Sequence, residues 1–151
     1  MIPLFITVPL LVILLDRITK WWALSFVCQA PLSLVGDYIS CMVTYNRGVS
    51  WSLLSSNTMY GFIAVALLVI LVIGALVMHT IKAYQQKHRI IGELLVLGGA
   101  LSNLYDRFAY DGVVDFIALR YGDWSFPIFN IADTAIVCGV LLMLYDATIR
   151  Q

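Results

Sequence analysis

Two carboxylates in this sequence have surroundings suited to acid–base chemistry. Asp115 precedes Phe116 and Ile117 and follows two valines, and Asp133 ends the segment Phe129–Asp133. The apolar setting of Asp115 is expected to raise its pKa, because desolvation penalises the charged form. Asp133 would lie at the positive end of a helix, which favours its ionised form. If the chain brings the two together, they titrate as a coupled pair, with one protonated and one ionised. One could then take a proton from water while the other protonates a peptide carbonyl, which hydrolyses a peptide bond without a metal or a covalent intermediate.

In each of two further polar pairs the two residues are four positions apart, so both would lie on the same face of a helix. Asp16 and Lys20 form the first pair, and Asn103 and Arg107 form the second, with Asp106 beside them. The simplest interpretation of the first pair is a self-neutralising ion pair whose lysine extends towards water at a membrane surface. The planar guanidinium of Arg107 could hold a carboxylate in place, and Asp106 is the candidate nearest in sequence.

Some of these residues also have a purely structural interpretation. The small residues of Gly98–Ser102 make a thin helix face that predicts close helix packing. Asn130 followed by Asp133 is typical of a helix start, with an asparagine cap and an acid in the first turn. Both interpretations are compatible with a site nearby.

The composition indicates the environment in which these residues must lie. Of 151 residues, 62% are hydrophobic and 12% charged, the net charge is zero, and the mean hydropathy is +0.92. A soluble domain carries about 25% charged residues, so this chain could not keep a water-facing surface hydrated. The absence of a basic stripe argues against nucleic-acid binding, and the high hydrophobicity argues against disorder. The sequence therefore predicts a membrane protein.

The apolar segments predict one integral membrane domain over residues 1–151 of the all-α class, because a spanning helix needs about 20 mostly apolar residues. The four expected spans are about 3–24, 60–81, 90–108 and 127–149. The first is expected to be a retained span rather than a signal peptide, since no basic region precedes it and no small-residue cleavage site follows. The connection 82–89 holds three basic residues and no acid, so it should be cytoplasmic, with both termini. Outer loops are then expected at about 25–59 and 109–126.

The first outer loop is expected to hold a small β-rich platform on the outer membrane surface. Apolar and polar residues partly alternate over Ile39–Tyr45, as in a short strand, and Gly36-Asp37 and Asn46-Arg47-Gly48 supply turn residues at either end.

Metal and thiol chemistry find little support. The chain has two histidines, His79 and His88, and no H-E-x-x-H helix, so we expect no metal and no cofactor. Cys138 is expected to be a packing residue, and Cys28 and Cys41 are assigned no role.

Five motifs occur in the order seen in lipoprotein signal peptidases (signal peptidase II), which this sequence resembles over nearly its whole length. They are Asp16-Arg17-Ile18-Thr19-Lys20, Asn46-Arg47-Gly48, Gly98–Arg107, Gly112-Val113-Val114-Asp115-Phe116 and Phe129-Asn130-Ile131-Ala132-Asp133. The order of the motifs, the chain length and the four expected spans together carry the resemblance.

The resemblance implies an intramembrane aspartyl endopeptidase of the bacterial inner membrane. Such enzymes remove signal peptides from prolipoproteins by cutting before a cysteine that carries diacylglycerol. Carried over by motif, the catalytic pair would be Asp115 and Asp133. The residues implied to bind substrate or shape the site are Asn46, Arg47, Gly48, Asn103, Arg107 and Asn130, and Asp16, Lys20 and Asp106 would support them. The implied partners are the lipidated substrate, membrane lipids and globomycin-type cyclic peptides, with no nucleic acid, and we expect a monomer.

The sequence departs from the family pattern at two places. Ser102 replaces the usual glycine, and Val49-Ser50-Trp51-Ser52 replaces the usual Ala-Ala-Phe-Ser. Substrate preference or inhibitor fit could differ at the second place.

Three other classes of protein fit the sequence less well than a peptidase does. A transporter or proton relay would place its ionisable groups near mid-span, whereas the acids here cluster at one membrane face. A membrane scaffold would leave Asp115 and Asp133 without a purpose. A presenilin-type protease would need a G-x-G-D motif, which is absent.

Overall fold

The computed structural model describes residues 2–27, 31–47, 59–110 and 112–149. Over these residues the chain forms four α-helices and a four-stranded antiparallel sheet, as a mostly helical chain with a small β platform was expected to do. The helices are α1 (Ile2–Trp22), α2 (Met59–Gln85), α3 (Ile91–Tyr110) and α4 (Ile131–Ile149), and a short π-helix, η1 (Ala23–Val27), continues α1. The strands are β1 (Leu32–Val35), β2 (Ile39–Asn46), β3 (Val113–Tyr121) and β4 (Trp124–Ser125). Cys28, Gly48 and Val49–Ser52 lie outside the described residues.

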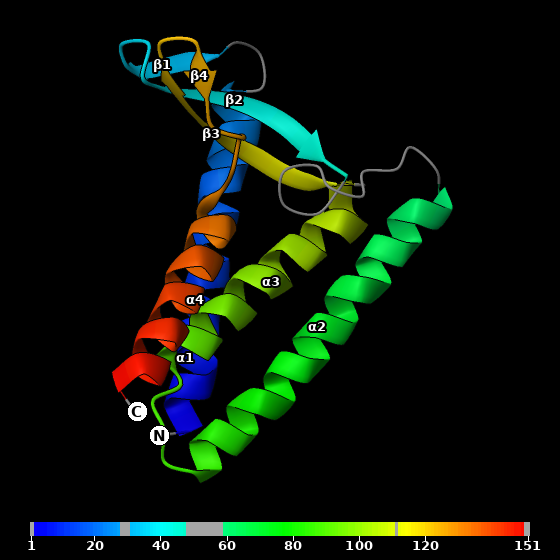
Figure 1. Ribbon diagram of the computed structural model, residues 1–151. Coiled ribbons are helices and arrows are strands. Elements are labelled where there is room, and N and C mark those ends of the chain that lie inside the picture. The colour runs from blue at the N-terminus through cyan, green and yellow to red at the C-terminus, as the bar shows by residue number, and fades with distance from the viewer. Residues whose placement is uncertain (1, 28–30, 48–58, 111, 150–151) are drawn as a thin grey trace.

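The sheet lies over one end of the helices, and both chain termini lie at the opposite end with the connection between α2 and α3 (Figure 1). Helix α3 contacts each of the other three helices, and α1 also contacts α4. A small core of Ala23, Val27, Cys41 and Phe116 joins the continuation of α1 to the sheet. The helices therefore hold the sheet at the end where α3 finishes and α4 begins.

The strand expected within Ile39–Tyr45 is confirmed as β2, but the sheet is not confined to the first connection. Strands β3 and β4 come from the second connection, and the strand order is β1-β2-β3-β4. Asp115 of β3 lies opposite Thr44 of β2. The first four residues of β3 are all buried, so the alternation of buried and exposed side chains that marks a half-exposed strand is missing there.

The fourth helix begins at Ile131, later than the expected 127. Just before the helix, Phe129 forms two strand-like hydrogen bonds with Ile117 of β3. The Phe129 N–H donates to the Ile117 carbonyl over 3.1 Å, and the Ile117 N–H donates to the Phe129 carbonyl over 2.9 Å. This exchange fixes the chain in an extended form up to Asn130, which then starts the helix.

Two of the helices, at Tyr60–Gln85 and Ile131–Ile149, are long and apolar enough to cross a membrane. Helices α1 and α3 each carry three charged residues: Asp16, Arg17 and Lys20 in α1, and Glu93, Asp106 and Arg107 in α3. That α1 and α3 also span the membrane stays a prediction.

The small residues of α3 let it approach two helices closely, as the sequence predicts. A Cβ on Gly98 would lie 2.9 Å from the Pro9 Cα of α1, and a Cβ on Gly99 would overlap the Ala132 carbonyl oxygen of α4. Gly92 and Gly139 meet in the same way further along α3 and α4. Backbone-to-backbone contact of this kind holds helices together in a membrane, where the hydrophobic effect does not drive helices to associate.

We predict that Gly99→Ala lowers the thermal stability of the detergent-solubilised protein, because the added methyl group meets backbone that cannot rotate away. Overpacking of this kind costs about 1–3 kcal/mol, which a melting curve would resolve. Gly74→Ala in α2 is the matched control, since nothing lies within 4 Å of the position its Cβ would take. Equal melting temperatures for the two variants would contradict this account of the α3–α4 contact.

Candidate functional site

The Lys20 ammonium is buried at the centre of a polar region between α1 and α3. Its side chain is 1% exposed, and its Nζ lies 2.7 Å from Asp16 Oδ2, 2.6 Å from Asp106 Oδ2 and 3.0 Å from Asn103 Oδ1. Three acceptors thus match the three protons of an ammonium group. The expected ion pair with Asp16 is confirmed, but the expectation that Lys20 extends to water is wrong, because acceptors on α3 hold the group inside.

Each carboxylate bound by Lys20 also fixes a backbone group of another element. Asp16 accepts hydrogen bonds from Ser102 Oγ at 2.7 Å and from the Ala132 N–H in the first turn of α4 at 3.0 Å. Asp106 accepts one from the Val114 N–H of β3 at 3.1 Å. The two carboxylates therefore position the starts of α4 and β3.

Arg17 completes the charge balance of this region. Its guanidinium lies 2.9 Å from Asp16 and 2.5 Å from Asp106, and it stacks over the Tyr105 ring at 5.0 Å. We call Asp16, Arg17, Lys20 and Asp106 the ionic cluster; its two cations offset its two anions. Burying such charges is tolerated only when each has partners, which these have.

Asp115 and Asp133 lie beside the ionic cluster and are joined by side-chain amides. Asn130 Nδ2 donates to Asp115 Oδ1 over 2.6 Å and contacts Asn103 Oδ1 at 3.2 Å, while Asn103 Nδ2 donates to Asp133 Oδ1 over 2.8 Å. Asn46 Nδ2 donates to the other oxygen of Asp115 over 3.2 Å. The three asparagines thus bring β2, β3, α3 and α4 together around the two carboxylates.

Asn130 also caps α4, as its spacing from Asp133 predicts. Its Oδ1 accepts the Asp133 N–H over 2.8 Å, and its carbonyl accepts the Thr134 N–H over 3.2 Å. The cap fixes the amide plane, and the same amide then directs its Nδ2 at Asp115. The structural and the functional interpretations of this residue therefore hold together.

The surroundings of Asp115 change its acidity. The side chain is 2% exposed, and this burial, together with the negative charge of Asp133, raises its pKa to about 7. The hydrogen bonds from Asn46 and Asn130 act in the opposite direction, because they stabilise the ionised form. Asp133 is only partly buried, so of the two carboxylates it is the more accessible to water.

The remaining residues singled out from the sequence have different positions. Buried Arg107 acts electrostatically on Asp115, Asp133 and Asp106. Arg47 follows β2 with an exposed side chain whose Cγ lies near Gly112. Gly48 lies outside the described residues.

Sequence reasoning missed Arg17 as a site residue. Its signal was its place between Asp16 and Lys20, since a third charged residue in an apolar segment needs partners of its own. Over the described part of the chain, no group of three or more His, Cys, Asp or Glu residues could hold a metal ion.

Comparisons with known proteins find similar sequences and a similar fold. The profile of the family described as Signal peptidase (SPase) II matches residues 8–149. A lipoprotein signal peptidase of Syntrophomonas wolfei is 42% identical over 136 residues, which is 89% of this chain and 86% of that protein. One of Clostridium acetobutylicum is 35% identical over 87% of this chain and 84% of its own length. A solved structure described as a bacterial membrane enzyme superposes with a TM-score of 0.73 at 29% identity and covers 93% of this chain and 90% of its own.

We predict that Lys20→Met strongly destabilises the protein, because it leaves two buried carboxylates short of a cation. Breaking one partner of a buried ion pair costs roughly 3–5 kcal/mol, which would be measured by thermal unfolding in detergent. Lys82→Met, at an exposed position in the last turn of α2, is the control. A Lys20→Met variant as stable as this control would show that the ionic cluster does not hold α1 to α3.

Proposed function

This chain belongs to the signal peptidase II family, and we propose that it removes signal peptides from prolipoproteins by a pair of aspartates that activate water. The observation that carries the proposal is the amide-linked pair of Asp115 and Asp133, set at the junction of β3 with α4. Family membership supports a membrane-bound peptidase acting on prolipoproteins. The aspartate mechanism and the cleavage position are our inference from the geometry and the motifs.

In the proposed mechanism Asp115 is the acid and Asp133 the base. A pKa of about 7 leaves Asp115 about half protonated at neutral pH and largely protonated below it, and two neighbouring carboxylates favour a state in which only one is ionised. Asp133 takes a proton from water as the water oxygen attacks the scissile carbonyl carbon, and Asp115 protonates the carbonyl oxygen. The tetrahedral diol then collapses: the proton on Asp133 passes to the departing nitrogen, the C–N bond breaks, and a hydroxyl proton returns to Asp115.

The surrounding amides and Arg107 have separate parts in this mechanism. Asn46 and Asn130 donate to Asp115, and Asn103 donates to Asp133, so each carboxylate keeps its direction through the proton transfers. The positive charge of Arg107 offsets the single negative charge of the pair. Arg47 and Gly48, which follow β2 in the sequence, are proposed to contact substrate.

A lipidated substrate suits a site at this end of the helices. Acyl chains hold a modified cysteine at the membrane interface, since each buried methylene contributes about 0.8 kcal/mol. The bond just before that cysteine would then lie at the depth of the α3 and α4 ends, where water can reach Asp133. We propose that cleavage occurs there, immediately before the diacylglyceryl cysteine, and that globomycin-type cyclic peptides occupy the same site.

The proposed topology has four spans in a single integral domain, residues 1–151. The basic connection at 82–89 and both termini lie in the cytoplasm, and the sheet and the aspartates lie at the outer face of the bacterial inner membrane. The positive-inside rule supports this orientation. The charges of α1 that argue against a span, Asp16, Arg17 and Lys20, are paired within the protein, which lowers the cost of placing them in the membrane. We propose that the chain acts as a monomer.

We predict that Asp115→Asn and Asp133→Asn each lower cleavage of a diacylglyceryl prolipoprotein by about a hundredfold or more, because each removes one partner in proton transfer. Both variants should fold, since an amide can occupy either position. The measurement is turnover by purified protein in detergent or liposomes, with melting temperature as the fold check. Asp123→Asn, in the exposed turn between β3 and β4, is the matched control and should retain activity.

Three results would count against this proposal. Cleavage that survives both substitutions would show that the aspartate pair is not catalytic. Loss of activity on adding a chelator would point to a metal mechanism. If substrate with and without the diacylglyceryl group were cleaved equally well, the enzyme would not require a lipidated substrate.

We further predict that activity falls as the pH rises through about 7, because Asp115 then loses the proton that it donates. Asn46→Ala removes a hydrogen bond that lowers the Asp115 pKa, so the alkaline limb of the kcat profile should move to higher pH. The profile of each protein would be recorded from about pH 5 to about pH 9, which covers both sides of the Asp115 pKa of about 7. A limb that stays in place, or moves to lower pH, would assign the proton to another group.

A further inference from the structure

The half of the sheet that ends in the β1–β2 and β3–β4 turns has one apolar face and one polar face. Cross-strand partners point to the same side of a sheet, and successive residues of a strand point to opposite sides. By the observed pairing, one side carries Leu32, Val35, Cys41, Ile117, Tyr121 and Trp124. The other side carries Ser33, Ser40, Ala118, Arg120 and Ser125. We call these two sides the apolar face and the polar face.

Protein covers only part of the apolar face. Cys41 is 3% exposed, because it packs in one core with Ala23 and Val27 of η1. Nearer the turns the side chains are open: Val35 is 53% exposed, Tyr121 74% and Trp124 61%. Since η1 continues α1 and lies against this face, the apolar face is the one turned towards the helices.

The open part of the apolar face is continuous with the start of α4. The Trp124 ring centroid lies 5.9 Å from that of Phe126, and the Phe126 centroid lies 5.7 Å from that of Phe129, two residues before α4. Tyr121 extends the row in the other direction, with its ring 6.0 Å from that of Tyr38 in the β1–β2 turn. Aromatic side chains thus lead to the end of the sheet from a helix that is long and apolar enough to cross a membrane.

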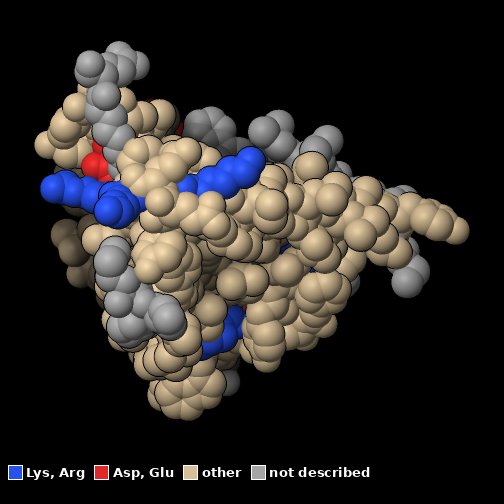
Figure 2. Space-filling view, turned by 90° about the horizontal axis from the view of Figure 1, so that it is seen from below, with Lys and Arg blue, Asp and Glu red and all other residues tan. Residues whose placement is uncertain are grey.

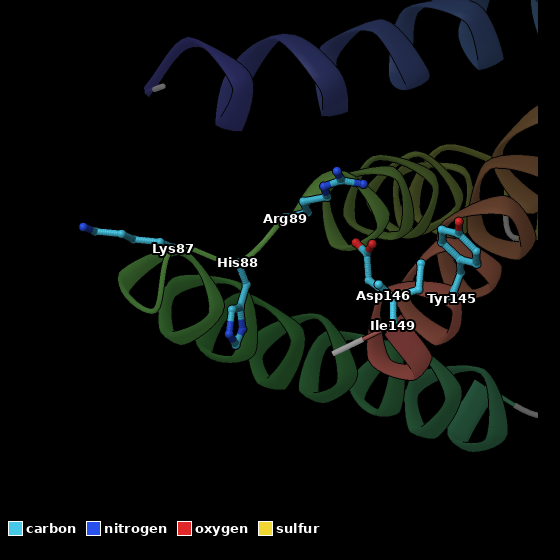
Figure 3. A pocket seen from close by; sticks show the side chains of 6 residues that line it. All are labelled: Lys87, His88, Arg89, Tyr145, Asp146 and Ile149. Carbon is cyan, nitrogen blue, oxygen red and sulfur yellow. The ribbon is translucent and has the colours of Figure 1, made fainter. Parts of the chain in front are cut away.

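The end of the molecule opposite the sheet has a different surface. Lys and Arg side chains stand there on a surface that is otherwise mostly uncharged (Figure 2). A pocket of about 610 Å³ at this end is lined mainly by polar and charged side chains from the α2–α3 connection and the last turns of α4 (Figure 3). Basic residues are typical of the cytoplasmic side of a membrane protein, and Trp and Tyr are typical of the membrane interface. With the basic end in the cytoplasm, the open aromatic side chains of the sheet lie at the outer interface.

We propose that the apolar face of the sheet is seated in the boundary between the headgroups and the acyl chains of the outer leaflet. Val35, Tyr121 and Trp124 contact lipid there, and the polar face remains in water. The sequence predicts only that a platform lies on the outer membrane surface, whereas the strand pairing indicates which face meets the lipid. Tyr and Trp suit this layer, because their rings are apolar and their O–H and N–H groups can bond to headgroups. This seat needs only that the protein resides in a membrane.

A seat of this kind would limit the depth of Asp115. Asp115 and Tyr121 belong to the same strand, β3, which is paired with β2 along this stretch. A strand rises about 3.3 Å per residue, so roughly 20 Å of paired strand joins the two residues. Lipid contact at Tyr121 therefore restrains the height at which Asp115 meets a bond held at the interface.

The test reads the depth of spin labels on the full-length protein in liposomes of phosphatidylethanolamine and phosphatidylglycerol. Cys28→Ser and Cys138→Ala remove two native thiols, and Cys41 stays, because its burial keeps it from the reagent. This background, treated with the same reagent, measures any residual labelling. Collisions of each label with oxygen, which concentrates among acyl chains, are compared with collisions with a water-soluble nickel chelate.

Single cysteines are introduced as two neighbouring pairs, one position on each face. Val35→Cys and Tyr121→Cys report on the apolar face, and Ser33→Cys and Ser125→Cys are their matched controls on the polar face. We expect the ratio of oxygen to nickel collisions to be about tenfold higher on the apolar face, because a polar chelate is excluded from hydrocarbon.

Three results would overturn the seat. Labels open to nickel at all four positions would place the whole sheet in water, and labels open mainly to oxygen at all four would show that the two faces do not differ. Labels on the apolar face that are shielded from both reagents, with spectra broadened by a second label nearby, would show that another copy of the chain covers this face.

Cleavage in the same liposomes tests the effect on Asp115, and this part rests on the proposed function. Tyr121→Ser combined with Trp124→Ser should lower kcat/KM for a lipidated substrate about tenfold in liposomes and leave it unchanged in detergent, where no bilayer fixes the depth. Tyr121→Phe with Trp124→Phe is the matched control and should retain activity. An equal loss in detergent, or no loss in liposomes, would contradict the restraint on Asp115. The spin labels report depth whether or not the protein cleaves prolipoprotein, so failure of one proposal is distinguishable from failure of the other.

Discussion

A lysine ammonium buried in an apolar bundle must have its charge and all three of its protons satisfied, and the arrangement of the site follows from that constraint. Lys20 finds its acceptors on its own helix, at Asp16, and on α3, at Asp106 and Asn103. Asp16 then fixes the first turn of α4, and Asp106 fixes the start of β3. The elements that carry the two candidate catalytic residues are thus positioned by the partners of a single cation.

The ionic cluster holds the fold together, and the aspartate pair is proposed to transfer protons. One set of carboxylates could not do both, because the two tasks need different partners. Carboxylates that hold a fold together need cations in direct contact, which keeps them ionised. A carboxylate that must carry a proton near neutral pH needs neutral partners instead, and Asp115 is held by the amides of Asn46 and Asn130. A hydrogen bond from an amide fixes the direction of a carboxylate and lowers its pKa less than a cation in contact would, so Asp115 keeps a pKa of about 7 beside the ionic cluster.

Local patterns predicted those parts of the structure that local interactions determine. The asparagine cap at Asn130, the ion pair of Asp16 with Lys20 and the strand expected within Ile39–Tyr45 all depend on residues a few positions apart, and each is confirmed. Strand β3 could not be read in this way, because its pairing partner β2 lies about 70 residues earlier and its first residues are buried on both faces. The inward direction of Lys20 likewise depends on acceptors more than 80 residues away, which no local pattern reports.

The four helices differ in hydropathy because two of them carry the charged residues that build the site. Helix α2 carries one basic residue, Lys82, in its last turn, whereas α1 and α3 carry Asp16, Arg17, Lys20, Asp106 and Arg107 at their sheet-facing ends. These five charges reduce the apolar character of both helices, and all five are gathered around one another or around Asp115 and Asp133. A helix that must position a polar site cannot also be uniformly apolar. The two helices that look least like membrane spans are therefore the ones whose charges build the site, while α2, which supplies none of these charges, is free to be almost wholly aliphatic.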